Sequence, residues 1–189
     1  LGSFYPPKFV LIDPTFLDTL DDREYRQGIA EMIKAGLIKN KALYTYLKNH
    51  TSVTEKEILM TLNVKRDIDL KDPFDQNERM ILNFGHTFGH AIEKKYHYET
   101  YKHGEAISYG MLIAIEIGIK KGITPKEIYE DVKQVLEKHQ LIKPPLFQMD
   151  MLKDDIKTDK KSMANTFHFI CLEDIGKSVI TNLKVGELI

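Results

Sequence analysis

Two histidines, His86 and His90, stand four residues apart in the run NFGHTFGHAIE at positions 83–93. On a helix their imidazoles would project from one face. The HExxH pattern of metalloproteases, in which a glutamate supplies the base, is absent because Thr87 follows His86. A third histidine, His103, precedes an apolar segment, and at a helix start a neutral, metal-binding imidazole is favoured over a cation. Three histidines within 18 positions therefore favour a divalent metal such as zinc.

Spacing does not decide which carboxylate would complete such a site, because Glu31, Glu93 and Glu105 are all candidates. A histidine pair at this spacing is also commonly a surface coincidence or a packed polar pair, and His103 alone would commonly cap a helix. The glycines that frame the histidines each weaken a helix by roughly 1 kcal/mol relative to alanine. Their spacing predicts that something approaches this helix backbone closely.

The composition is that of a globular chain. Its 189 residues are 42% hydrophobic and 29% charged, which suits one domain or a large piece of a bigger protein. A net charge of −1 gives no basic field for nucleic acid or an anionic membrane. The longest apolar stretch, 106–119, is too short to span a bilayer, and no signal peptide is expected. These features predict neither membrane nor nucleic-acid partners. The single cysteine, Cys171, cannot form an internal disulfide, so we expect a cytoplasmic protein.

The apolar periodicity predicts a mainly α-helical fold. Helices are expected over 21–38, 54–68, 80–96, 104–121 and 125–137. Asp21 would cap the first helix, Thr54 and Glu57 would form a capping box on the second, and Thr124 would cap the last. The stretch 71–77 reads as a polar loop.

Strands are expected only near the two ends. Phe9–Asp13 lies between two prolines and reads as one short buried strand, whereas 166–172 and 177–183 flank a turn and read as a small C-terminal β-hairpin. One strand cannot form a sheet. The N-terminal run therefore predicts a sheet-bearing region upstream of this chain.

Three segments together resemble the 3-dehydroquinate synthases: GIAEMIK at 28–34, RMILNFGHTFGHAIE at 79–93, and HGEA at 103–106. Asp159-Lys160-Lys161, before the expected hairpin, is also similar to that family. The resemblance runs from about Phe4 to the C-terminus and covers the family's C-terminal domain. It implies a multi-helix domain of the dehydroquinate synthase-like, or glycerol dehydrogenase-like, fold. Residues 1–189 would form this metal- and substrate-binding domain, with 1–20 a remnant of the connection to a missing N-terminal NAD-binding domain.

The resemblance also implies roles for individual residues. The metal ligands would be Glu31, His86 and His103, holding one zinc or cobalt ion. The substrate would be bound by Lys34, Lys65, Arg79, Asn83, His90 and Lys160, with Lys34, Lys65 and His90 catalytic. The NAD would be contacted from this side of the cleft by Phe16, Leu17, Asp18 and Thr19. By base rate alone, the lysines would be solvated helix residues.

The chain departs from the family at one loop. Where the family has Glu-x-Gly-Leu-Arg, this chain reads DQNER at 75–79. Asn77 can adopt a left-handed conformation almost as glycine does, but Asp75 is shorter than glutamate, which leaves its role open. The choice between Lys160 and Lys161 as the pocket residue also stays open.

The activity that the resemblance implies is a lyase reaction of the shikimate and chorismate pathway. 3-Deoxy-D-arabino-heptulosonate 7-phosphate would become 3-dehydroquinate and phosphate, with NAD reduced and reoxidised within one turnover. Iron- or zinc-dependent alcohol or glycerol dehydrogenases, sugar-phosphate cyclases of secondary metabolism, and a non-catalytic metal-binding module are the alternatives. The cationic side chains favour an anionic sugar phosphate as substrate. The full-length protein is expected to be a homodimer. This chain alone, which has no GxGxxG turn, is expected to fold without catalysing turnover.

Overall fold

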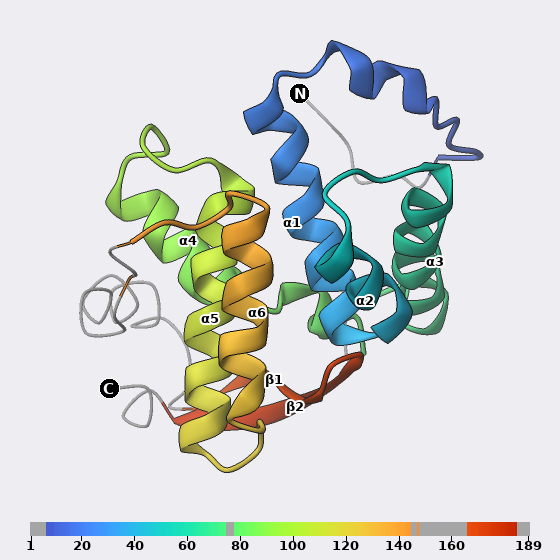
Figure 1. Cartoon of the computed structure of the whole chain (residues 1–189). Helices are drawn as coiled ribbons and strands as arrows, with labels where there is room; N and C mark the ends of the chain where they lie inside the picture. Colours follow the sequence, from blue (N-terminus) through green and yellow to red (C-terminus); the bar gives the residue numbers. More distant parts are fainter. Residues whose placement is uncertain (1–6, 75–77, 145–146, 148–165, 185–189) are drawn as a thin grey trace.

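The computed structural model describes residues 7–74, 78–144, 147 and 166–184. Within them the chain forms eight helical segments followed by one β-hairpin (Figure 1). The elements are η1 (Pro14–Thr19), α1 (Asp22–Ile38), α2 (Lys41–Asn49), α3 (Glu55–Lys71), η2 (Glu78–Asn83), α4 (His86–Lys95), α5 (His103–Lys120), α6 (Glu127–Lys138), β1 (Thr166–Asp174) and β2 (Lys177–Lys184). The prediction of a mainly α-helical fold with a C-terminal hairpin is confirmed.

Helix α5 is the centre of the core. It is apolar on all sides, and most of its residues, from Gly104 to Gly118, are buried. A helix of that composition must be surrounded, and α1, α4, α6 and β1 pack around it (Figure 1). Its first residue, His103, stays exposed, so the core helix carries a histidine to the edge of the molecule.

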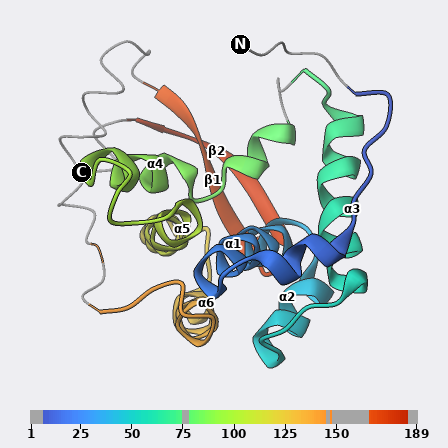
Figure 2. The ribbon, with the colours of Figure 1, turned by 90° about the horizontal axis from the view of Figure 1, so that it is seen from above.

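The hairpin packs against α1 and α5. Its strands pair antiparallel, with Phe169 opposite Thr181, and the consecutive residues Phe169–Leu172 are all buried. Because successive side chains point to opposite faces of a strand, both faces of β1 are covered. Figure 2 shows the hairpin running between the side of the molecule that carries α4 and α5 and the side that carries α3. The amide of Gly176 donates to the carbonyl of Leu37 over 2.8 Å, which fixes the turn against the end of α1.

Local capping signals were predicted correctly at two helices and wrongly at a third. Asp21 accepts a hydrogen bond from the amide of Glu24 over 2.8 Å, and Thr54 with Glu57 forms the capping box of α3. Helix α6 instead begins at Glu127, without a side-chain cap. Thr124 is buried against the end of α5, where its amide donates to the carbonyl of Gly118, and within the described residues its hydroxyl has no hydrogen-bond partner.

The helix expected over 80–96 is wrong as one element. Gly85 has a φ of 79°, in the left-handed region, and it separates η2 from α4. An α-helix cannot continue through that conformation. The break makes His86 the first residue of α4 rather than a residue in the middle of a long helix. Helix α2, capped by Asn40, was not predicted at all.

The buried strand expected at Phe9–Asp13 is also wrong. Within the described residues this run pairs with no strand, and Phe9, Val10 and Leu11 are 83%, 70% and 86% exposed. A strand needs a neighbour to satisfy its backbone groups, and apolar side chains alone do not provide one. Among the described residues, no helix is long and apolar enough to cross a membrane.

The two glycines of the histidine run are explained by a close crossing of α4 and α5. A Cβ on Gly110 would lie 2.1 Å from the carbonyl oxygen of Gly85 and 2.8 Å from the amide nitrogen of Gly89. A Cβ on Gly89 would in turn lie 2.5 Å from the side chain of Ile107. The expected close approach is therefore confirmed, and what approaches is the backbone of α5.

Gly110→Ala should destabilise the chain by roughly 3 kcal/mol, because its new methyl group meets backbone atoms that cannot rotate away. For a chain of this size we expect the midpoint of thermal unfolding to fall by roughly 6–12 °C. The matched control is Gly28→Ala in α1, where a Cβ meets nothing within 4 Å. That variant should gain up to about 1 kcal/mol from helix propensity. Equal melting temperatures for the two variants would contradict the close crossing.

Candidate metal centre

Three separate helices bring Glu31, His86 and His103 together. Glu31 lies in the middle of α1, whereas His86 and His103 are the first residues of α4 and α5. One ligand atom from each side chain lies within 4.8 Å of the other two. The distances from Glu31 Oε1 to the Nε2 atoms of His86 and His103 are 3.8 and 3.7 Å.

The start of α5 is fixed on α1 by polar contacts. The Gln27 side-chain oxygen accepts hydrogen bonds from the amides of Gly104 and Glu105, over 2.7 and 3.3 Å. Arg23 makes a two-point ion pair with Glu105, with contacts of 2.8 and 2.7 Å. Gln27 lies one helical turn before Glu31 in α1. The side chains that cap α5 therefore also set the position of His103 relative to Glu31.

The two imidazoles present the same nitrogen to Glu31. Nδ1 of His86 lies 3.2 Å from the carbonyl oxygen of Phe84, and Nδ1 of His103 lies 3.1 Å from Oε1 of Glu93. Because a carbonyl and a carboxylate can only accept, each Nδ1 must donate. Each neutral ring then leaves the lone pair of Nε2 directed toward Glu31.

The three candidate carboxylates, Glu31, Glu93 and Glu105, make different contacts. Glu105 is engaged by Arg23, and Glu93 contacts the far side of the His103 ring. Oε1 of Glu31 is buried and has no hydrogen-bond partner among the described residues. In tetrahedral zinc sites, ligand atoms at about 2.1 Å from the ion lie roughly 3.4 Å apart. The set of Glu31, His86 and His103 therefore fits a divalent ion in chemistry and in spacing.

Lys34 balances the charge of Glu31. Its ammonium lies 2.6 Å from Glu31 Oε2, and its side chain is only 7% exposed. Burial raises the pKa of Glu31, but the facing His103 ring and the Lys34 ammonium outweigh it and hold the pKa at about 2. Burial lowers the pKa of Lys34, whereas the charge of Glu31 opposes that shift. Glu31 is thus ionised at neutral pH.

The pKa values of the two histidines shift in opposite directions. Burial, together with the charge of Lys34, lowers the pKa of His86 to about 4. The carboxylates of Glu31 and Glu93 raise the pKa of His103 above its ordinary value. His86 is therefore neutral at pH 7 and ready to bind a metal, whereas His103 competes with protons.

A cavity of about 440 Å³ opens beside these side chains. Of the predicted substrate residues, Lys34, Lys65 and Asn83 line it, together with Glu31 and His103. Five further wall residues were not predicted as part of the site: Ala35, Thr61, Leu62, Val64 and Leu82. Thr61 lies one helical turn before Lys65, a spacing that could have identified it.

Two predicted substrate residues lie outside that cavity lining. His90 is exposed beside it, with its ring centroid 5.4 Å from that of His86. The Arg79 guanidinium instead pairs with Asp69 of α3, over 3.3 Å. Lys160, the remaining predicted substrate residue, lies outside the described residues, as do Lys161 and Asp75.

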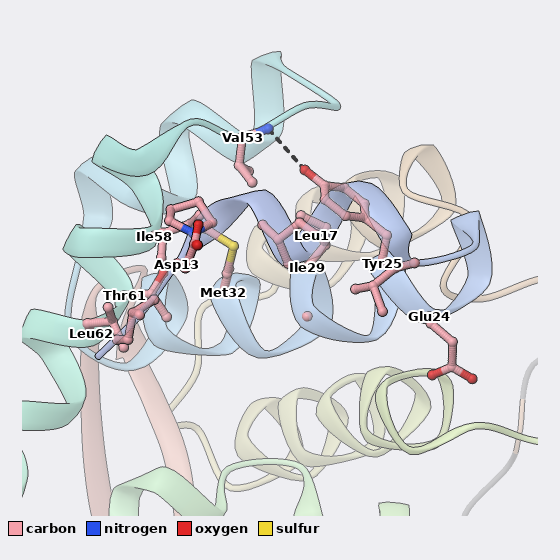
Figure 3. A pocket seen from close by; sticks show the side chains of 14 residues that line it. Asp13, Leu17, Glu24, Tyr25, Ile29, Met32, Val53, Ile58, Thr61 and Leu62 are labelled. Atoms are coloured by element: carbon pink, nitrogen blue, oxygen red, sulfur yellow. Dashed lines mark hydrogen bonds between the residues drawn. The ribbon is translucent and has the colours of Figure 1, made fainter. Parts of the chain in front are cut away.

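The predicted NAD-contacting residues Phe16–Thr19 form most of η1. Leu17 lines a second, apolar cavity of about 280 Å³ between η1, α1 and α3 (Figure 3). The side chains of Ile29 and Met32 form part of its wall, and Phe16 is 70% exposed. Both cavities include Thr61 and Leu62 in their lining, so one stretch of α3 separates them.

Comparison with protein families gives a match to the model described as 3-dehydroquinate synthase C-terminal, over residues 28–162. A 3-dehydroquinate synthase from Clostridium perfringens is 42% identical over 192 residues, which cover 98% of this chain and 55% of the relative. One from Streptococcus pyogenes is 40% identical over 196 residues, covering 99% of this chain and 54% of the relative. The chain therefore spans about half the length of the curated relatives it matches.

Two solved structures share the fold of this chain. A 2-epi-5-epi-valiolone synthase from Streptomyces hygroscopicus, with NAD+ and Zn2+ bound, is 26% identical with a TM-score of 0.80. It is matched over 100% of this chain and 55% of its own. A 2-deoxy-scyllo-inosose synthase complexed with carbaglucose-6-phosphate, NAD+ and Co2+ is 23% identical, with a TM-score of 0.78. It is matched over 100% of this chain and 56% of its own, and at that identity it shows the fold alone.

Proposed function

The chain belongs to the 3-dehydroquinate synthase family, and we propose that it is the metal- and substrate-binding half of such an enzyme. The proposed reaction is a lyase step in the shikimate and chorismate pathway. It converts 3-deoxy-D-arabino-heptulosonate 7-phosphate into 3-dehydroquinate and phosphate. The observation that carries the proposal is the unpartnered, buried Oε1 of Glu31, which faces two imidazole nitrogens beside a cavity that Lys34 and Lys65 also line.

Glu31, His86 and His103 would hold the divalent metal, zinc or cobalt. When bound, the ion would polarise the substrate oxygens that it contacts. Glu31 supplies one negative charge to the site, and His86 is already neutral at pH 7. His103 has to release its proton more often as the pH rises, so metal affinity should rise with it.

The remaining cavity residues would act on the substrate directly. Lys34 presents a buried, compact positive charge next to Glu31, suited to stabilising negative charge on a substrate oxygen. Lys65 and Asn83, which line the cavity, would orient the sugar phosphate. His90, exposed at the rim beside His86, would carry a proton between this site and solvent. Arg79 and Lys160 stay proposed ligands for the substrate's negatively charged groups.

The NAD would lie mostly outside this chain. Its chemistry is to accept a hydride from a secondary alcohol of the substrate and to return it in the same turnover. The sequence has no glycine-rich GxGxxG turn to hold a pyrophosphate, so most of that site would belong to an N-terminal domain of the full-length protein. Phe16–Thr19 would contact the cofactor from this side. We propose a cytoplasmic homodimer for the full-length protein.

The test is to incubate the full-length protein that carries this chain with Zn2+ or Co2+, NAD and the heptulosonate phosphate. Phosphate and 3-dehydroquinate should form in equal amounts without net NADH. Net NADH from glycerol or a simple alcohol would indicate a dehydrogenase. Phosphate release from another sugar phosphate alone would indicate a different cyclase. The isolated 189-residue chain should release no phosphate.

A further inference from the structure

The imidazole of His103 lies between two carboxylates, one on each ring nitrogen. Nδ1 lies 3.1 Å from Oε1 of Glu93, and Nε2 lies 3.7 Å from Oε1 of Glu31. Glu31 comes from α1 and Glu93 from the third turn of α4. The ring itself is half-exposed at the start of α5.

The two carboxylates contact the ring differently. The contact with Glu93 is a hydrogen bond, in which Nδ1 has to donate because a carboxylate can only accept. Oε1 of Glu31 lies beyond hydrogen-bond distance of the ring and, within the described ranges, has no hydrogen-bond partner. The proton of the neutral ring is therefore held on the Glu93 side. The lone pair of Nε2 is left for the space between Glu31 and His86.

Because Glu93 is buried, its carboxylate needs the hydrogen bond from His103. The side chain of Glu93 is only 10% exposed, and a buried carboxylate without a polar partner is costly. His86 uses a backbone carbonyl, that of Phe84, for the same purpose. Within the part of the chain that the structure describes, Nδ1 of His103 contacts no such carbonyl, and Glu93 supplies the acceptor. Glu93, His90 and His103 also gather closely enough to resemble a second ligand set, but Glu93 and His103 are already paired there.

We propose that Glu93 is a positioning residue for the metal centre. It would fix the tautomer and the orientation of His103, so that Nε2 is always available to the ion held with Glu31 and His86. This inference rests on the proposed function, because it assumes that the ion binds there. Carboxylates behind metal-bound histidines commonly set the tautomer and increase the basicity of the ligand nitrogen.

The test compares the metal-free and zinc-titrated 189-residue chain with two variants and a control. Glu93→Leu removes the acceptor and keeps an apolar side chain in the buried position. Glu93→Gln keeps a neutral acceptor of the same shape. The control, Glu99→Gln, makes the same change in charge at an exposed position after α4.

Two measurements decide the outcome. Nitrogen-15 NMR of the metal-free chain, at a pH where the ring is neutral, should show His103 protonated on Nδ1 in the parent, the control and Glu93→Gln. In Glu93→Leu the proton should move toward Nε2. Zinc titration should show the dissociation constant rising by roughly 10–100-fold in Glu93→Leu, less in Glu93→Gln, and not in the control.

An unchanged tautomer in Glu93→Leu, or zinc affinity within twofold of the parent, would overturn the role of Glu93. If the leucine variant does not fold, a parent chain in which the neutral His103 ring is protonated on Nε2 would overturn it as well. A parent chain that binds no zinc would instead overturn the metal site of the proposed function. The tautomer in the metal-free chain separates these two failures, because it does not depend on the ion.

Discussion

Replacing Glu31 with glutamine should weaken zinc binding by roughly a thousandfold. Protein zinc sites have apparent binding free energies of roughly 10–16 kcal/mol, so losing the charged member of a three-ligand set should cost about 4 kcal/mol. A neutral amide oxygen cannot replace the carboxylate whose unpartnered Oε1 faces His86 and His103. Competition titration with a zinc-binding dye measures the loss directly.

The control is Glu24→Gln, the same substitution two turns earlier in α1. Glu24 forms an ion pair with Lys102 at the surface, over 2.7 Å, so its loss should leave zinc affinity within a factor of two. The melting temperature of the metal-free Glu31→Gln variant must also be measured, because the substitution leaves the ammonium of Lys34 buried without its carboxylate. A folded Glu31→Gln variant with the affinity of the parent would rule out Glu31 as a ligand.

Features of the fold that depend on neighbouring residues could be predicted from the sequence. The Asp21 cap, the capping box at Thr54 and the C-terminal hairpin each depend on a few adjacent residues, and each formed as expected. The left-handed Gly85 shows the limit. Its position suggested a close backbone approach, which is correct, but the helix break at the same residue was not predicted. Gly85 therefore both allows the close approach of α5 and ends the helix before His86.

Features that depend on contacts between distant residues could not be predicted. The apolar run Phe9–Asp13 has the composition of a buried strand, yet it lies exposed because composition does not specify a partner. Arg79, a predicted substrate ligand, pairs with Asp69 of α3, and its local sequence gave no sign of that partner. In each case the outcome depends on which other segment comes close, and no local pattern records that.

The metal centre depends both on local sequence patterns and on contacts between distant residues. Residue types and spacing identified the histidines, but left Glu31, Glu93 and Glu105 as equal candidates. Only the family resemblance chose Glu31. The structure gives physical reasons for that choice, since Arg23 engages Glu105 and the His103 ring engages Glu93. These contacts link residues up to 82 positions apart, beyond the reach of any periodicity.

Lys34→Met in the full-length protein should lower kcat/KM by roughly a hundredfold to a thousandfold, the usual cost of removing one fixed charge from a reacting centre. The methionine keeps the length of a nearly buried side chain and removes only its ammonium. The pKa of Glu31 should rise from about 2, because Lys34 is one of the groups that lower it, but Glu31 should stay ionised at pH 7. Zinc affinity should therefore change far less than kcat/KM.

The comparison of these two measurements tests whether Lys34 acts on the substrate or only holds Glu31. If Lys34 only positions Glu31, zinc affinity and kcat/KM should fall by the same factor, and excess zinc should restore activity. If Lys34 contacts the substrate, saturating zinc should restore nothing. Lys39→Met is the control, because Lys39 lies just after the end of the same helix and pairs with Glu78 at the surface, over 2.7 Å. Full activity in Lys34→Met would remove Lys34 from the site, whereas a loss in both variants would indicate a general effect of charge.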